Sequence, residues 1–188
     1  YADDSYLIVP SAGAGTILDE LNHISEWAVK NNLKLNTSKT MEMIIYRPRV
    51  KRDPPPSLPG ISRVESMKIL GVIFQSDLSF REHVKQIISN CAQNTYALRI
   101  LKAHGLSGSG LWEVTSATLV NRATYASQAW WGMLDAEDRG RIQAMLNKVI
   151  KQGFLPPIHR SLSEICDAAD AKLFSAIRRN PHHVLHHL

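Results

Sequence analysis

The sequence predicts an α+β chain, in which short strands and one helix over residues 1–79 are followed by an all-helical piece over residues 80–188. The apolar residues of the first piece form short β-branched runs around a single helical stripe. After Phe80, apolar residues recur at spacings of three and four, and glycines and prolines separate the successive helical patterns. The chain is 44% hydrophobic and 21% charged, which supports a buried core and excludes a disordered chain.

The first piece predicts strands and a helix in alternation. Its expected elements are a hairpin over 1–9, a helix over 16–32, a strand over 41–46, an exposed loop over 47–59 and a buried strand at the end of 61–74. Asn31-Asn32 provides a helix stop. Pro54-Pro55-Pro56 and Pro59 exclude a helix from the loop. Gly71 indicates a bulge or a close approach of backbone within the last strand.

The second piece predicts helices throughout. The apolar stripes place them over 80–104, 111–126, 136–151 and 161–179. Glycines after His104 and the Pro156-Pro157 pair separate these patterns.

No run of 18 or more apolar residues is present, so the sequence predicts no transmembrane segment, and no signal peptide is visible.

The charge and the cysteines restrict the partners and the compartment. The net charge of +5 suits a phosphate-rich partner, although many basic proteins bind no nucleic acid. The chain has two cysteines, Cys91 and Cys166, and two thiols far apart in sequence are no disulfide framework. Their apolar neighbours predict that both are small buried side chains. The two separate thiols suit a reducing, intracellular compartment, which could be the cytoplasm or the nucleus.

Asp3 and Asp4 are the strongest candidates for chemistry. Strands avoid aspartate, so two adjacent carboxylates between apolar residues need an explanation. An oxygen-rich, doubly negative turn suits Mg²⁺, and nucleotidyl transfer uses two such ions held by carboxylates from more than one strand. A solvated turn is the alternative interpretation.

Three segments together resemble reverse transcriptases, in the same order along the chain. The tetrapeptide Tyr1-Ala2-Asp3-Asp4 resembles their signature turn. The segment 31–48 resembles the next block in enzymes of non-LTR, LINE-type retrotransposons, with the sequence NNLKLNTSKTMEMIIYRP. The segment 66–80 resembles the hairpin that follows there, with the sequence SMKILGVIFQSDLSF.

The resemblance implies a role for each matching residue. Asp3 would be a metal ligand, Asp4 a less strict one, and Tyr1 would lie against the primer end. Lys39 would approach the triphosphate as a general acid for the leaving pyrophosphate, although a solvated surface lysine is the alternative. Lys68 and Gly71 would belong to a hairpin that grips the primer strand.

The resemblance also implies a fold and a reaction. Residues 1–79 would be the C-terminal part of a polymerase palm, with short antiparallel strands and a helix, and residues 80–188 a helical thumb with a C-terminal extension. The reaction would be RNA-directed DNA polymerisation with two Mg²⁺ ions, an RNA template, a DNA primer and deoxynucleoside triphosphates. The family's other catalytic aspartate and its fingers lie upstream of this turn. We therefore expect a fragment that does not polymerise alone.

A thumb would present cations to the template–primer duplex. The candidates are Lys85, Arg99, Lys102, Arg122, Arg139, Arg141, Lys148 and Lys151. Contacts from them would go to phosphates and carry no sequence information. The alternative is that these cations lie on ordinary solvated helix faces.

Trp130 and Trp131 could stack on bases, but paired tryptophans in an apolar stretch favour a core position.

Two competing interpretations of the chain remain open at this stage. It could be a non-catalytic nucleic-acid-binding relic of such an element, or a decayed fragment with no cellular role.

The histidines at 182, 183, 186 and 187 form two pairs spaced four residues apart, and such pairs can bind zinc from one helix face. No further ligand lies near them in the sequence, and they also resemble the tail of this retrotransposon group. The sequence fixes neither the element of origin nor the oligomeric state.

Overall fold

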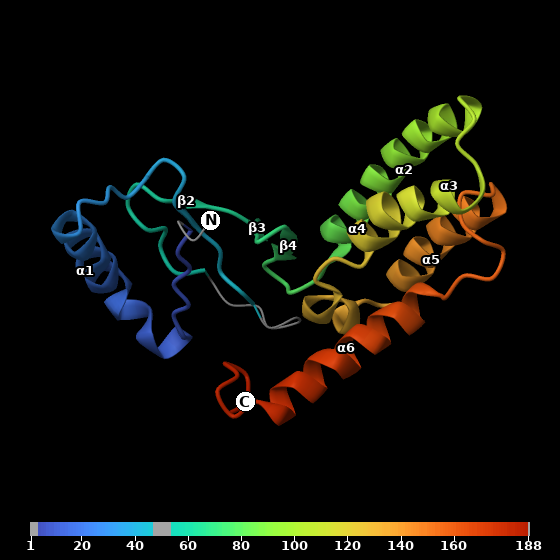
Figure 1. Cartoon of the computed structure of the whole chain (residues 1–188). Helices are drawn as coiled ribbons and strands as arrows, with labels where there is room; N and C mark the ends of the chain where they lie inside the picture. Colours follow the sequence, from blue (N-terminus) through green and yellow to red (C-terminus); the bar gives the residue numbers. More distant parts are fainter. Residues whose placement is uncertain (1–3, 47–53, 188) are drawn as a thin grey trace. The chain divides into compact units, whose positions relative to one another are not determined.

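A computed structural model describes residues 4–46 and 54–187 and shows two compact units. The first, called the N-terminal unit here, comprises residues 4–44 and 54–65. The second, the helical unit, comprises residues 45–46 and 66–187. Both units are shown in Figure 1, and each is described by itself.

The N-terminal unit contains one helix and one short pair of strands. A 3₁₀ turn, Ser11–Thr16, leads into α1, Ile17–Lys30. Strand β1, Met41–Glu42, pairs with β2, Ser62–Arg63. The prediction of a helix was confirmed, whereas the strand over 41–46 is only two residues long. Among the described residues of the predicted hairpin over 1–9, no strand forms.

The β1–β2 pair is parallel, so the prediction of antiparallel strands was wrong for this pair. Arg63 stabilises it, because its Nε donates to Glu42 Oε1 at 2.8 Å and its two terminal nitrogens donate to the carbonyls of Pro55 and Pro56. A parallel pair requires a long crossover connection, and the proline-rich loop supplies it. The guanidinium thus holds both the neighbouring strand and the end of the loop.

The N-terminal unit buries little apolar surface by itself. Of its described residues, Ala28 alone is buried. Trp27 is 59% exposed and Val29 is 73% exposed on the same helix. Because apolar burial is the main stabilising contribution to a fold, this unit has a small core of its own.

The helical unit begins with an antiparallel hairpin. Strand β3, Ser66–Ile69, pairs with β4, Val72–Gln75, through the two-residue turn Leu70-Gly71. The hairpin implied by the resemblance is present here, and the interpretation of 61–74 as ending in one continuous strand was wrong. The compact units separate at residue 65, and the hairpin lies with the helices. A palm–thumb boundary at residue 79 stays a prediction.

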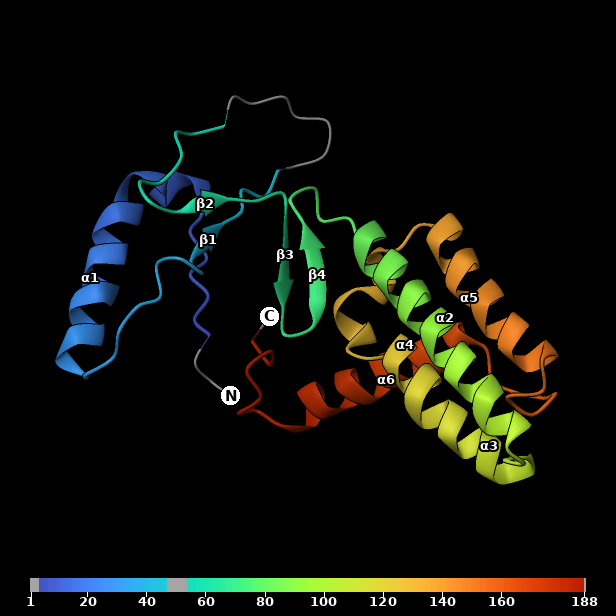
Figure 2. The same ribbon diagram turned by 90° about the horizontal axis from the view of Figure 1, so that it is seen from above.

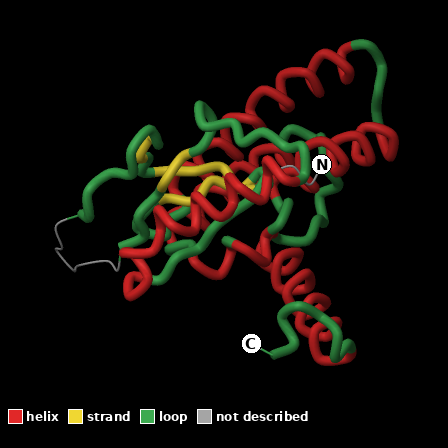
Figure 3. Tube along the Cα trace, turned by 90° about the vertical axis from the view of Figure 1, so that its left-hand side faces the viewer, coloured by secondary structure: helices red, strands yellow, loops and turns green. Residues whose placement is uncertain are grey.

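Helices make up most of the rest of the chain, as Figure 3 shows. They are α2 Arg81–Ala103, α3 Gly108–Thr115, α4 Asn121–Ala123, α5 Ala136–Lys151 and α6 Leu162–Arg179. A π-helical segment, Ser116–Val120, joins α3 to α4. In Figures 1 and 2, α2 lies beside α5 and beside the α3–α4 rod. The four predicted helical patterns were confirmed, although the second begins at Gly108, contains the π-helical segment and ends at Ala123 rather than at residue 126.

Side-chain caps explain why two of these helices start where they do. Asp135 accepts from the amide of Asp138 at 2.8 Å before α5. Ser161 and Glu164 form a reciprocal capping box before α6. Each cap satisfies amide groups that the first helical turn would otherwise leave unpaired.

The core of the helical unit gathers side chains from the hairpin and all of the longer helices. Its largest fully buried members are Trp130, Phe80, Leu111, Leu119, Ile142, Leu146, Leu155 and Leu162. Trp131 is also buried, and its ring meets that of Trp130 edge to face at 5.9 Å. The prediction that both tryptophans belong to the core was confirmed.

Both cysteines are buried in this core, as predicted. Burial raises the pKa of the Cys91 thiol to about 11 and also raises the pKa of Cys166. Both thiols are therefore protonated near neutral pH and act as small apolar side chains.

Over the described part of the chain, no helix has the length and apolar character needed to cross a membrane.

Candidate nucleic-acid interface

The predicted metal-binding turn lies at the start of the chain. Tyr1 and Asp3 lie outside the described residues, and Asp4 is exposed in a segment without regular structure. Within residues 4–46 and 54–187, no three His, Cys, Asp or Glu side chains gather as a metal site. A two-ion site needs further carboxylates beside Asp3 and Asp4, so their metal binding stays a prediction.

Lys39 lies in a polar turn between α1 and β1 that Asn36 organises. The Asn36 carbonyl accepts from the amide of Lys39 at 3.0 Å and from the hydroxyl of Thr40 at 3.0 Å. Its side-chain oxygen accepts from Ser38 at 2.7 Å. These bonds fix the turn backbone and leave the lysine side chain exposed. The ammonium is therefore available to an anionic ligand.

The hairpin brings two predicted primer contacts into the helical unit. Lys68 is exposed on β3, and Gly71 is exposed at the turn. Gly71 has a φ of +93°, a left-handed conformation that glycine adopts at little cost. A Cβ atom there would lie 3.2 Å from the ring of Tyr125, so this position also requires a small residue. The glycine therefore matters here for its turn geometry and for its contact with Tyr125.

His83 connects the hairpin to the core and was not singled out by the sequence analysis. Its Nδ1 accepts from the amide of Ile73 at 3.4 Å, and its ring meets Trp130 edge to face at 5.0 Å. Its Nε2 is buried and has no hydrogen-bond partner among the described residues. Desolvation, with a smaller effect from Lys68, holds the pKa of His83 below its usual value of 6.5. The imidazole is therefore neutral in the folded protein at neutral pH.

Acidification is expected to destabilise the helical unit through His83. Well above pH 6.5 the imidazole is neutral in both states, so its titration does not affect stability. As the pH falls below 6.5 the unfolded chain takes up a proton first, and the free energy of unfolding decreases towards the lower folded-state pKa. Urea unfolding between pH 8 and pH 5 measures this decrease. A His83→Gln variant should lose part of the decrease, and an unchanged pH dependence in that variant would contradict the assignment.

The predicted thumb cations divide into two groups. Lys102 donates to the carbonyl of Gln152 at 2.9 Å at the end of α5, and its ammonium lies 5.3 Å from the centre of the Phe154 ring. Arg139 donates to the carbonyl of Trp131, and Arg141 pairs with Asp138 at 2.8 Å. These three cations therefore have roles within the fold. All eight are exposed, and the other five make no side-chain hydrogen bond or ion pair within the described residues: Lys85, Arg99, Arg122, Lys148 and Lys151.

Lys85 and Arg99 lie on one side of α2. They are separated by close to four helical turns, because an α-helix has 3.6 residues per turn. Both can therefore face the same phosphate-bearing partner. Whether any of these cations binds nucleic acid stays a prediction.

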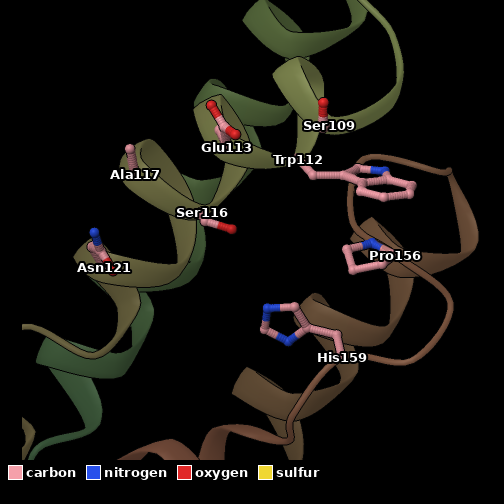
Figure 4. Close-up of a pocket in the computed structure, with 8 residues that line it drawn as sticks. All are labelled: Ser109, Trp112, Glu113, Ser116, Ala117, Asn121, Pro156 and His159. Atoms are coloured by element: carbon pink, nitrogen blue, oxygen red, sulfur yellow. The ribbon is translucent and has the colours of Figure 1, made fainter.

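A shallow groove of about 450 Å³ lies along the α3–α4 rod. Figure 4 shows its lining residues, Ser109, Trp112, Glu113, Ser116, Ala117, Asn121, Pro156 and His159. The π-helical segment contributes Ser116 and Ala117, and such segments often occur at functional sites. The lining contains one carboxylate, Glu113, which does not provide a two-metal site. The helical periodicity of this region gave no sign of the groove.

The histidine tail contacts α6 through His186. His186 Nδ1 lies 2.8 Å from the carbonyl oxygen of Ile177, and the rings of His186 and His187 meet edge to face. The imidazole of His186 thus has a backbone partner on the helix before it.

Comparison with known proteins gives a partial relationship. The chain is 28% identical over 112 residues to the RNA-directed DNA polymerase from mobile element jockey of Drosophila funebris. This similarity covers 56% of the chain but spans only 12% of that protein. No family model and no solved structure matches the chain. The similarity is distant, and it supports a relationship to non-LTR reverse transcriptases.

Proposed function

We propose that this chain is part of an RNA-directed DNA polymerase, a nucleotidyltransferase, of a LINE-type retrotransposon. The observation that carries the proposal is the partial similarity to the jockey polymerase. The order of the three segments that resemble reverse transcriptases supports it. The chain spans 12% of the jockey protein, so the proposal concerns a larger polypeptide that contains these residues.

In this polymerase Asp3 and Asp4 contribute carboxylates to two Mg²⁺ ions. Carboxylate oxygens suit such a hard cation, and both ions need ligands from more than one strand. The remaining ligand comes from another part of the polymerase. Lys39 protonates the departing pyrophosphate, and its exposed position in an ordered turn supports this role. We therefore propose that the 188 residues alone do not polymerise.

The hairpin and the helices bind the template–primer duplex. Lys68 and Gly71 on the hairpin contact the primer, and Lys85 and Arg99 on α2 contact phosphates. The exposure of the three cations supports this assignment. Lys102 is a weaker candidate, because its ammonium already binds the carbonyl of Gln152.

A non-catalytic nucleic-acid-binding relic is the second candidate. The exposed cations of the helical unit and the net charge of +5 favour it. Such a relic would keep the duplex-binding surface but would not catalyse nucleotide addition. Nucleotide incorporation by a longer polypeptide would therefore favour the polymerase over the relic.

The test compares the 188-residue chain with a polypeptide extended upstream along the same reading frame. Both are expected to bind an RNA–DNA template–primer, with affinity that falls on the order of tenfold to a hundredfold between 50 and 200 mM salt for a few phosphate contacts. Only the extended polypeptide should add deoxynucleotides to the primer in the presence of Mg²⁺. Binding without incorporation by the extended form would favour the relic. Absence of salt-sensitive binding in both would overturn both candidates.

A further inference from the structure

The tip of the β3–β4 hairpin adopts an unusual backbone conformation. Leu70 has a φ of +46° and Gly71 a φ of +93°, which are the signs of a type I′ turn. The first of these positions is usually occupied by glycine, asparagine or aspartate, and a bulky leucine is strained there. Leu70 is also 71% exposed, so core packing does not explain its side chain. Strained residues persist where surrounding contacts hold them, and they are frequent at functional sites.

Tyr125 holds this tip from a distant part of the sequence. Its hydroxyl donates to the carbonyl of Leu70 at 3.1 Å across 55 residues of sequence. Its ring lies against Gly71, where a Cβ atom would approach the ring carbon Cε1 to 3.2 Å. One side chain therefore contacts both residues of the turn.

Tyr125 is itself fixed by the core. Its carbonyl accepts from the indole Nε1 of Trp130 at 3.0 Å, and Trp130 is fully buried. The Trp130 ring packs against His83, whose Nδ1 accepts from the Ile73 amide on β4. The hairpin is thus held at its tip by Tyr125 and along β4 by His83, and Trp130 connects the two contacts.

We infer that Tyr125 is a positioning residue that fixes the hairpin tip on the helical unit, so that the hairpin meets the primer strand as a rigid edge. The exposed side chains on this edge are the Lys68 cation and the apolar Leu70. The primer contact rests on the proposed function, whereas the contact between Tyr125 and the hairpin does not. Tyr125 acts through Leu70 and Gly71 and need not touch the primer.

Hydrogen exchange of the 188-residue chain tests the positioning directly. Tyr125→Phe keeps the ring but removes the donor to the Leu70 carbonyl, and losing one hydrogen bond corresponds to a change of roughly three- to tenfold in an opening equilibrium. The amides of residues 66–75 should therefore exchange about three- to tenfold faster. Tyr96→Phe is the matched control, because Tyr96 is 67% exposed on α2 and its hydroxyl makes no hydrogen bond within the described residues. Unchanged hairpin exchange in Tyr125→Phe would overturn the inference.

Steady-state kinetics of the extended polypeptide test the link to the primer. A hairpin that positions the primer predicts that Tyr125→Phe raises the KM for template–primer severalfold and changes kcat by less than about twofold. A purely structural effect would lower kcat through a smaller folded fraction and leave KM unchanged, and that result would overturn the positioning role. If the wild-type polypeptide neither binds nor extends a template–primer, the proposed function and the primer role both fail. Hydrogen exchange still decides the Tyr125 contact in that case.

Discussion

Replacing Asp3 with asparagine is expected to remove metal-dependent nucleotide incorporation from the proposed polymerase. The neutral amide keeps the size of the carboxylate but loses the charge that holds a divalent cation. Loss of one such electrostatic contribution lowers kcat by on the order of a hundredfold to a thousandfold. Single-turnover primer extension at saturating template–primer measures the effect. Asp4→Asn should cost less, because the resemblance implies a less strict ligand at Asp4.

Asp19→Asn is the matched control for this experiment. Asp19 is an exposed carboxylate in the first turn of α1, outside the predicted metal site. The same change of charge there should leave incorporation close to that of the unmodified protein. If Asp3→Asn retains full Mg²⁺-dependent incorporation, the assignment of this turn to the metals is wrong.

Trp130→Ala is expected to be the most destabilising single substitution proposed for the helical unit. Trp130 is fully buried, donates to the carbonyl of Tyr125 and packs against His83 and Trp131. Truncation leaves a large cavity and an unpaired carbonyl, and such changes cost about 3–5 kcal/mol of folding free energy. Urea unfolding of the 188-residue chain, followed by circular dichroism, measures this loss.

Trp27→Ala provides the comparison for Trp130→Ala. The Trp27 side chain is 59% exposed on α1, and surface substitutions usually change stability by less than about 0.5 kcal/mol. A loss at Trp130 no larger than the loss at Trp27 would mean that Trp130 is not the centre of the core. The contrast also separates a packing effect from the general effect of removing an indole.

The helices of the second half follow from local rules. Residues 136–151 were predicted as a helix and form α5 with these bounds, because an apolar stripe and the cap at Asp135 act within a few residues of sequence. The burial of Cys91 follows from the same pattern, since apolar residues on one helical face must meet another element. Trp130 lies between two 3₁₀ turns, and its burial was predicted from the tryptophan pair in an apolar stretch.

Other features depend on residues far apart in the chain and could not be predicted from local patterns. The continuous-strand interpretation failed at Leu70, because a bulky residue rarely adopts a positive φ. The parallel β1–β2 pair depends on Arg63 reaching both Glu42 and the proline-rich loop. Lys102 was grouped with the duplex-binding cations, and only the packing of α2 against α5 brings it to the carbonyl of Gln152.

The sequence by itself determined the helical character of the second half and the apolar faces that form its core. It also indicated a relationship to reverse transcriptases, which the partial similarity to the jockey polymerase supports. These properties are encoded in periodicity and in short motifs, which act over one or two helical turns. Only the tertiary structure decided that the hairpin lies with the helices, that His83 and Tyr125 hold it there, and which cations have contacts within the fold. The physical reason is that hydrogen bonds and packing contacts between distant segments exist only after the chain has folded, and no local pattern specifies their partners.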